Sequence, residues 1–150
     1  MKEIRLILTS VLMTMTLTMV AQHRYVQTDG KAFDGYDLVS YRGGEPVLGI
    51  EKYKAQYDGL TLYFANMANL QEFQRDPEFY MPAYGGYCAT AVSNETLIVP
   101  NFTNFDIQND KLLFFETRGF FNGKTEWKKD PQLFEILADR HYRQTFSEDN

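Results

Sequence analysis

The stretch KYKAQYDGLTLYF, residues 52–64, restricts the possible folds of this chain more strongly than any other segment. Aromatic or apolar side chains alternate with polar ones on both sides of Asp58-Gly59. Glycine in a two-residue turn accepts the positive φ that such a turn requires. We therefore expect a β-hairpin here. The stretch NFDIQNDKLLFFE, residues 104–116, predicts a second hairpin that turns around residues 108–111.

Three sites carry the sequence signals of helix starts. Asn66 can cap a helix in which Met67, Leu70 and Phe73 recur at helical spacing. The pairs Asp76-Pro77 and Asp130-Pro131 each place proline at the first position of a helix. The second pair predicts a last helix that ends near residue 146, with one face made by Phe134, Leu137, Ala138, His141 and Tyr142.

The order of these elements predicts an α+β fold. We expect a small antiparallel sheet of hairpins packed with two or three helices, not a parallel βαβ array. Asp34-Gly35 reads as a turn, and YDLVSYR, residues 36–42, reads as a short strand after it. The glycines in residues 43–46 indicate a further turn.

Residues 1–21 have the layout of a signal peptide. Lys2 and Arg5 precede an apolar run over residues 6–20, and Ala21 offers a small residue at the cleavage point. The alternatives are an uncleaved anchor and a buried N-terminal helix. Cleavage would leave residues 22–150 as one exported domain, in the periplasm or outside the cell, with no remaining membrane span.

Composition argues against nucleic acid as a partner and excludes a disulfide within the chain. The 150-residue chain has a net charge of −5 and no dense Lys/Arg block, which argues against nucleic acid as a partner. Its single cysteine cannot form an intramolecular disulfide, so we expect stability to come from packing. Neither a Cys-x-x-Cys nor a His-Glu-x-x-His spacing occurs.

That single cysteine, Cys88, lies in the stretch YGGYCATAV, residues 84–92. If a short helix or turn starts near Gly86, its free N–H groups would lower the pKa of the Cys88 thiol. The resulting thiolate would suit a soft metal, Cu(I) or Zn, with the Met81 thioether as a second ligand. Alternatively, Cys88 is a small core residue, or a nucleophile paired with His141.

The glycines of this stretch predict a sharp turn against a close neighbour. Tyr84, Gly85, Gly86 and Tyr87 are the residues we expect at a ligand-binding pocket, where a flat or cationic molecule would stack on aromatic walls. The alternative is that the tyrosines only pack the core. His23 follows the predicted cleavage point, and a free amine beside it would chelate a cupric ion.

Three stretches together resemble the YHS-domain family, in particular its secreted bacterial branch. They are FDGYDLVSYRGGEPVLG, residues 33–49; YDGLTLYFANMANLQEFQRDPEFYMPAYGGYCATAV, residues 57–92; and NDKLLFFE, residues 109–116. The stretch EWKKDPQLFEILADRHY, residues 126–142, resembles the C-terminal helix of that branch as well, so the resemblance covers nearly the whole chain after residue 21. It implies an exported binding domain. Relatives attached to copper-pumping ATPases suggest a metal role through pairs of cysteines, but this chain has a single cysteine.

These observations leave three candidate functions. The first is a non-enzymatic binding domain, with a soft metal ion or a small molecule as ligand. The second is a thiol-based redox protein that would use Cys88, although the chain has no second cysteine to resolve an oxidised thiol. The third is a structural interaction module of the cell envelope.

Overall fold

Both predicted hairpins are present in the computed structural model, which describes residues 23–147. Strand β3 (Ile50–Tyr57) pairs with β4 (Leu60–Phe64), and β5 (Asn101–Gln108) pairs with β6 (Lys111–Phe115). Asp58 and Gly59 have φ of 47° and 78°, and both central residues of the second turn, Asn109 and Asp110, also have positive φ. These signs match the type I′ geometry preferred in tight hairpins.

The predicted helix starts are confirmed by their capping hydrogen bonds. Helix α1 (Met67–Arg75) is capped by Asn66, α2 (Pro77–Tyr80) by Asp76, and α5 (Pro131–Phe146) by Asp130. In each case the side chain accepts a hydrogen bond from a backbone N–H of the first turn, which satisfies a group that the helix itself leaves free.

Two further helices were not predicted. They are α3 (Ala89–Ser93) and α4 (Gly123–Trp127), each of five residues. A helix this short completes little more than one turn, so it shows no apolar periodicity in the sequence. The α+β class is confirmed, with five α-helices within residues 23–147 instead of two or three.

The strand predicted over residues 36–42 is wrong. The chain instead forms two 3₁₀ turns, η1 (Phe33–Gly35) and η2 (Ser40–Gly43), and Tyr36 makes only an isolated bridge to Leu48. The Asp37 carboxylate accepts the Val39 N–H at 2.9 Å, which bends the backbone where a strand would continue. Asp side chains often compete with strand hydrogen bonds in this way.

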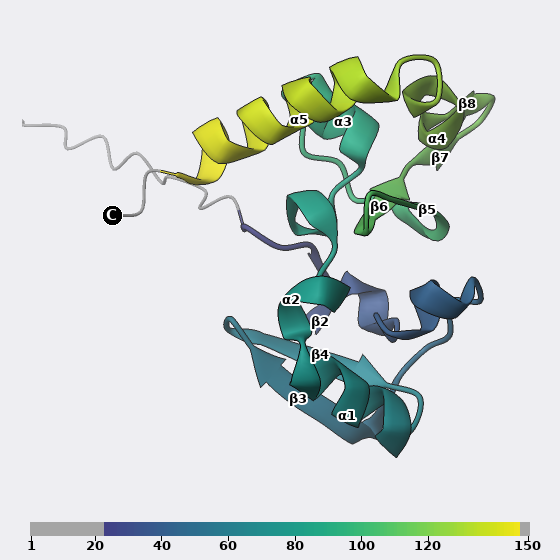
Figure 1. Cartoon of the computed structure of the whole chain (residues 1–150), viewed down its shortest axis with the longest axis vertical. Coiled ribbons are helices and arrows are strands. Elements are labelled where there is room, and N and C mark those ends of the chain that lie inside the picture. The colour runs from purple at the N-terminus through teal and green to yellow at the C-terminus, as the bar shows by residue number, and fades with distance from the viewer. Residues whose placement is uncertain (1–22, 148–150) are drawn as a thin grey trace, which may run out of the picture.

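Strand β6 lies between two apolar clusters. Leu112 and Phe114 pack into a lower cluster with Tyr41, Phe64 and Phe73. Leu113 and Phe115, on the opposite face, pack into an upper cluster with Trp127 and Ala138. Because successive residues of a strand point to opposite sides, this one strand joins both clusters. Figure 1 shows the β3–β4 hairpin and α1 below β6, and α3 and α5 above it.

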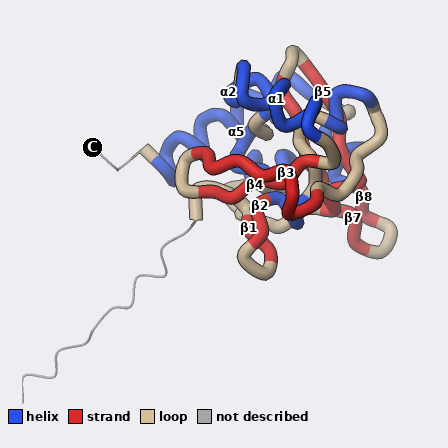
Figure 2. The backbone as a smooth tube through the Cα atoms, turned by 90° about the horizontal axis from the view of Figure 1, so that it is seen from below, coloured by secondary structure: helices blue, strands red, loops and turns tan. Residues whose placement is uncertain are grey.

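The strands of residues 23–147 remain in four separate two-stranded sheets. The two short ones are β1 (Gln27–Thr28) with β2 (Lys31–Ala32), and β7 (Thr117–Arg118) with β8 (Phe121–Asn122). Figure 2 shows β1 and β2 beside the β3–β4 hairpin. None of the helices described here has the length and apolar character that a membrane crossing needs. The predicted signal peptide, residues 1–21, lies outside the described residues.

Candidate functional site

The predicted sharp turn of the YGGYC stretch is the 3₁₀ turn η3 (Ala83–Gly86). Its last three residues, Tyr84, Gly85 and Gly86, have φ of 54°, 60° and 81°. Glycine adopts this region readily, but a tyrosine there is strained and is held by its surroundings. A Cβ on Gly85 would overlap the Arg24 carbonyl oxygen, and one on Gly86 would lie 2.6 Å from the Phe33 ring.

The neighbour that approaches this turn is the chain's own segment of residues 23–26, called the N-terminal strap here. Val26 N–H donates to the Gly85 carbonyl at 2.8 Å. Tyr87 Oη donates to the His23 carbonyl at 2.7 Å, and Tyr142 Oη donates to the Arg24 carbonyl at 2.6 Å. Of the residues predicted to bind a ligand, Gly85, Gly86 and Tyr87 therefore contact other parts of the same chain. His23 has its carbonyl fixed by the same contacts.

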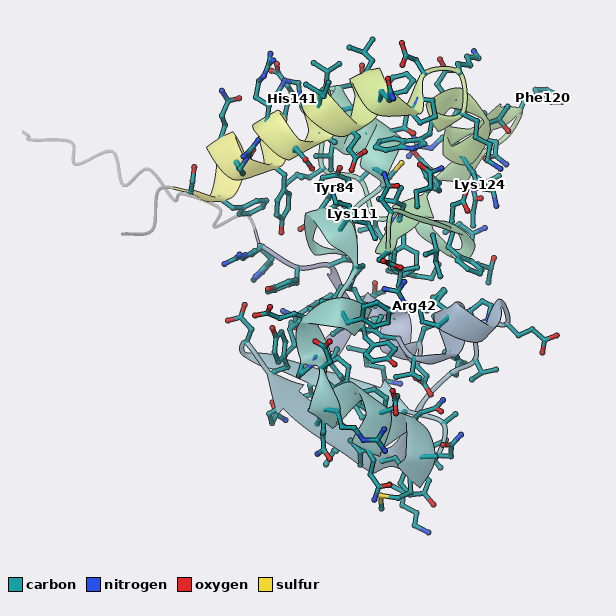
Figure 3. All side chains as sticks on the ribbon, viewed as in Figure 1. Arg42, Tyr84, Lys111, Phe120, Lys124 and His141 are labelled. Carbon is teal, nitrogen blue, oxygen red and sulfur yellow. The ribbon has the colours of Figure 1, made fainter. Side chains whose placement is uncertain are left out.

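Tyr84 faces a different space, an open hollow of about 400 Å³ called the Tyr84 hollow here. Phe79, Met81, Tyr84 and Tyr142 provide its apolar lining, and the charged residues are Glu78, Asp110, Lys111, Asp139 and Arg143. Figure 3 shows Tyr84 and Lys111 close together near the centre of the molecule. An aromatic-walled pocket beside the Gly-Gly turn is therefore present, with Tyr84 as the predicted residue that lines it.

Hydrogen bonds and ion pairs fix one wall of the Tyr84 hollow. Tyr84 Oη donates to Asp139 Oδ1 at 2.9 Å, and Lys111 Nζ lies 2.7 Å from Glu135 and 3.6 Å from Asp139. Burial, together with the neighbouring carboxylate, raises the pKa of Tyr84, so its hydroxyl remains a donor. Neither Lys111 nor Asp139 was predicted from the sequence as a site residue. The one available signal was the spacing of Glu135 and Asp139, four residues apart on one helix.

Cys88 is buried, with 1% of its surface exposed. Its Sγ accepts the Glu116 N–H at 3.2 Å, and the residue directly precedes α3. Burial raises the pKa of the Cys88 thiol, although N–H groups of Glu116, Ala91 and Thr90 act in the opposite direction. The expected lowering of the pKa is therefore wrong: the local N–H groups are present, but desolvation outweighs them.

The other candidate groups do not gather around Cys88. Met81 lines the Tyr84 hollow, whereas Cys88 lines a separate cavity. The two ring nitrogens of His141 lie 3.2 Å from the Val92 carbonyl and 3.3 Å from Glu95. Within residues 23–147, no three His, Cys, Asp or Glu side chains come together as a metal-binding group.

The fold and the site together define an α+β domain with a buried thiol and an aromatic hollow beside a Gly-Gly turn. No family model, curated protein or solved structure matches this chain. The resemblance to the YHS-domain family thus rests on the sequence motifs described above.

We predict that the protein loses stability progressively from about pH 9 upward. Burial raises the pKa of Cys88 above its ordinary value of 9.0 and that of Tyr142 from 10.0 to about 12. Both folded-state pKa values exceed the unfolded ones, so this stabilisation is fully present below pH 9 and is lost as pH rises through the folded values. Urea unfolding from pH 7 to 11 measures it.

The Cys88→Ala variant provides the control for this pH dependence. It should lose the part of the decline that begins near pH 9 and keep the part from the buried tyrosines. A free energy of unfolding that stays level or increases between pH 9 and pH 11 would contradict the prediction.

Proposed function

We propose that this chain is an exported, YHS-like, non-enzymatic binding domain, and that the Tyr84 hollow is its ligand site. The observation that carries the proposal is the hollow itself: about 400 Å³, open to solvent, and walled by the aromatic rings of Phe79, Tyr84 and Tyr142. Small-molecule sites are typically concave spaces of 300–1,000 Å³ with apolar walls and a few placed polar groups.

The strained backbone of Tyr84 supports this location. A tyrosine with φ of 54° costs free energy, and such strain is concentrated at functional sites. Tyr84 is also fixed at both ends, because its ring packs 6.0 Å from the Tyr142 ring and its hydroxyl donates to Asp139. A wall held in this way needs little rearrangement when a ligand binds, and preorganisation favours affinity.

The state of Cys88 favours a binding role over thiol chemistry. A reactive cysteine is a thiolate in an accessible site, whereas burial keeps this thiol protonated and covered. The same condition opposes a soft-metal role, since the thiolate is also the form that binds Cu(I) or Zn. Rapid consumption of hydrogen peroxide by native protein would favour the redox alternative, and a tight Cu(I) complex that Cys88→Ala abolishes would restore the metal alternative.

The experiment is a titration of the protein with 2-naphthol, a flat uncharged aromatic probe, followed by ¹H–¹⁵N NMR. We expect saturable shifts at the amides of Tyr84 and Tyr142. Phe79, which is 40% exposed, forms one wall of the hollow. Phe79→Ala should weaken binding about fivefold or more, since it removes one stacking partner with its contact area.

The matched control is Phe120→Ala, because Phe120 is a fully exposed aromatic residue outside the lining of the Tyr84 hollow. In Figure 3 it projects from the outer edge of the molecule. Equal loss of affinity in both variants, or shifts confined to residues far from Tyr84, would contradict the location of the site. The export part of the proposal is tested by mass spectrometry in the native host, where an intact Met1 would contradict it.

A further inference from the structure

A second cavity, of about 350 Å³, lies over the buried thiol. We call it the Cys88 cavity. Its wall combines parts that are distant in the sequence: Cys88 and Ala91 at α3, Ile98 in the following loop, Glu116 after β6, Phe121 in β8 and Glu126 in α4. It shares none of its lining residues with the Tyr84 hollow.

The charged side chains that line the Cys88 cavity all have the same sign. Glu116 and Glu126 are its two carboxylates, and no Lys, Arg or His is among the described residues of its lining. Their partners, Arg118 and Lys129, are 77% and 65% exposed, so both ion pairs lie at the solvent boundary. Exposed pairs of this kind are weak, and a cation inside the cavity can compete with them.

Glu116 is the more informative of the two carboxylates. Its side chain is only 13% exposed, and the residue directly follows β6 next to the buried Phe115. Its backbone is fixed from both sides: the N–H donates to Cys88 Sγ, and the carbonyl accepts from Gly123 N–H at 2.9 Å. The carboxylate is near enough to the thiol for its charge to raise the pKa of Cys88. Arg118 lies 2.7 Å from this carboxylate, so a cation in the cavity would share or replace that existing partner.

The rest of the wall combines apolar residues with the polar side chains of Thr90, Asn94 and Thr96. Ala91 and Ile98 offer aliphatic surface, and Phe121, which is 45% exposed, offers an aromatic ring. An aromatic face attracts an ammonium group, and the attraction increases where water is excluded. A cavity with carboxylates, an aromatic ring and aliphatic surface is complementary to a molecule that has a cationic head and a short apolar body.

From this combination we infer that the Cys88 cavity is a second binding site, distinct from the Tyr84 hollow, for a small primary ammonium ion with an apolar stem. Glu116 and Glu126 would accept hydrogen bonds from the ammonium group. Phe121 and Ile98 would contact the stem. Charge-assisted hydrogen bonds are stronger than neutral ones, so an amine should bind more tightly than a neutral molecule of the same shape.

The test compares three probes of similar shape: 3-methylbutylammonium, 3-methyl-1-butanol and 4-methylpentanoate. Each is titrated into the protein and followed by ¹H–¹⁵N NMR at the amides of Ala91, Ile98 and Phe121. We expect saturable shifts with the ammonium ion and an affinity about tenfold or more above that of the alcohol. The carboxylate probe should leave these amides unshifted.

Single charge removals identify the residues responsible. Glu116→Gln and Glu126→Gln should each weaken ammonium binding by about tenfold. The matched control is Glu51→Gln, which makes the same change on the exposed strand β3, outside the cavity lining. If Glu116→Gln fails to fold, Glu126→Gln still decides the outcome. The inference is overturned if amine and alcohol bind equally, or if the two cavity variants bind as Glu51→Gln does.

The two proposed sites can fail independently. Phe79→Ala should leave the affinity for 3-methylbutylammonium unchanged, because Phe79 lines only the Tyr84 hollow. Ammonium-induced shifts at Tyr84 and Tyr142, with none at Ala91 and Phe121, would overturn the assignment to the Cys88 cavity and leave the proposed binding function standing. Conversely, if 2-naphthol fails to bind while 3-methylbutylammonium binds as expected, the Tyr84 hollow is not a ligand site and the Cys88 cavity still is.

Discussion

Asp37→Asn is expected to lower the free energy of unfolding by about 3 kcal/mol or more, since hydrogen bonds to a buried charged group are worth about 1.5–3 kcal/mol each. Asp37 is fully buried. Its Oδ1 accepts the Val39 N–H at 2.9 Å, and its Oδ2 accepts the Ala65 N–H at 2.9 Å and Asn69 Nδ2 at 2.6 Å. An amide in this place must turn an NH₂ group toward a donor.

Chemical denaturation of wild type and variant at neutral pH measures this loss. Asp34→Asn is the matched control. Asp34 lies only three residues before Asp37 but is exposed, and asparagine tolerates its φ of 55°. We expect the control to change stability by less than about 0.5 kcal/mol, as is usual for surface substitutions. Equal effects of the two substitutions would show that the buried hydrogen bonds of Asp37 contribute little.

The predictions that succeeded depend on neighbouring residues. Asp58-Gly59 selects its turn through the conformations open to glycine, and Asp130-Pro131 starts a helix through a cap and a ring within the same turn. The partners in these interactions are at most three residues apart. Their geometry is therefore contained in a short stretch of sequence, whatever the rest of the chain does.

The strand predicted over residues 36–42 failed for the opposite reason. Alternation of apolar and polar residues favoured a strand, but the partners of Asp37 include Ala65 and Asn69, which are 28 and 32 residues away. Those contacts exist only after the end of the hairpin and the start of α1 have packed beside Asp37. A pattern in seven residues does not include them, so tertiary context overrode local propensity.

In the candidate site, too, the features set by neighbouring residues were predicted, and those set by distant residues were not. The sequence located the turn and its tyrosines, and local N–H groups do surround Cys88 as expected. The sign of the shift in the Cys88 pKa depended on burial, which a short stretch of sequence does not show: Cys88 lies beside the fully buried Phe114, to which it forms a backbone bridge. The Tyr84 hollow likewise needs α5 beside η3, since Tyr142 and Asp139 form part of its wall.

Gly85 joins the turn to the N-terminal strap more closely than any side chain would allow. Its φ of 60° suits glycine, and a Cβ at this position would overlap the Arg24 carbonyl and lie 2.6 Å from Tyr142 Oη. Both atoms belong to the hydrogen bond that holds the strap against α5. Even alanine therefore has no room unless the strap leaves its place.

Gly85→Ala is accordingly expected to release the strap and lower the free energy of unfolding by about 4 kcal/mol. The sum includes about 1 kcal/mol for the left-handed backbone, about 2 kcal/mol for exposing Val26 and about 1 kcal/mol for the lost hydrogen bonds. Hydrogen exchange at the Val26 amide and proteolysis within residues 23–27 would report the release directly.

Gly59→Ala separates the conformational cost from the steric one. Gly59 has a φ of 78°, and a Cβ there would meet no atom within 4 Å, so only the backbone term of about 1 kcal/mol applies. If Gly85→Ala costs no more than Gly59→Ala, the close approach to Arg24 has no energetic weight. If it costs several times more and the Val26 amide exchanges rapidly, then Gly85 holds the strap because glycine alone leaves room for the Arg24 carbonyl.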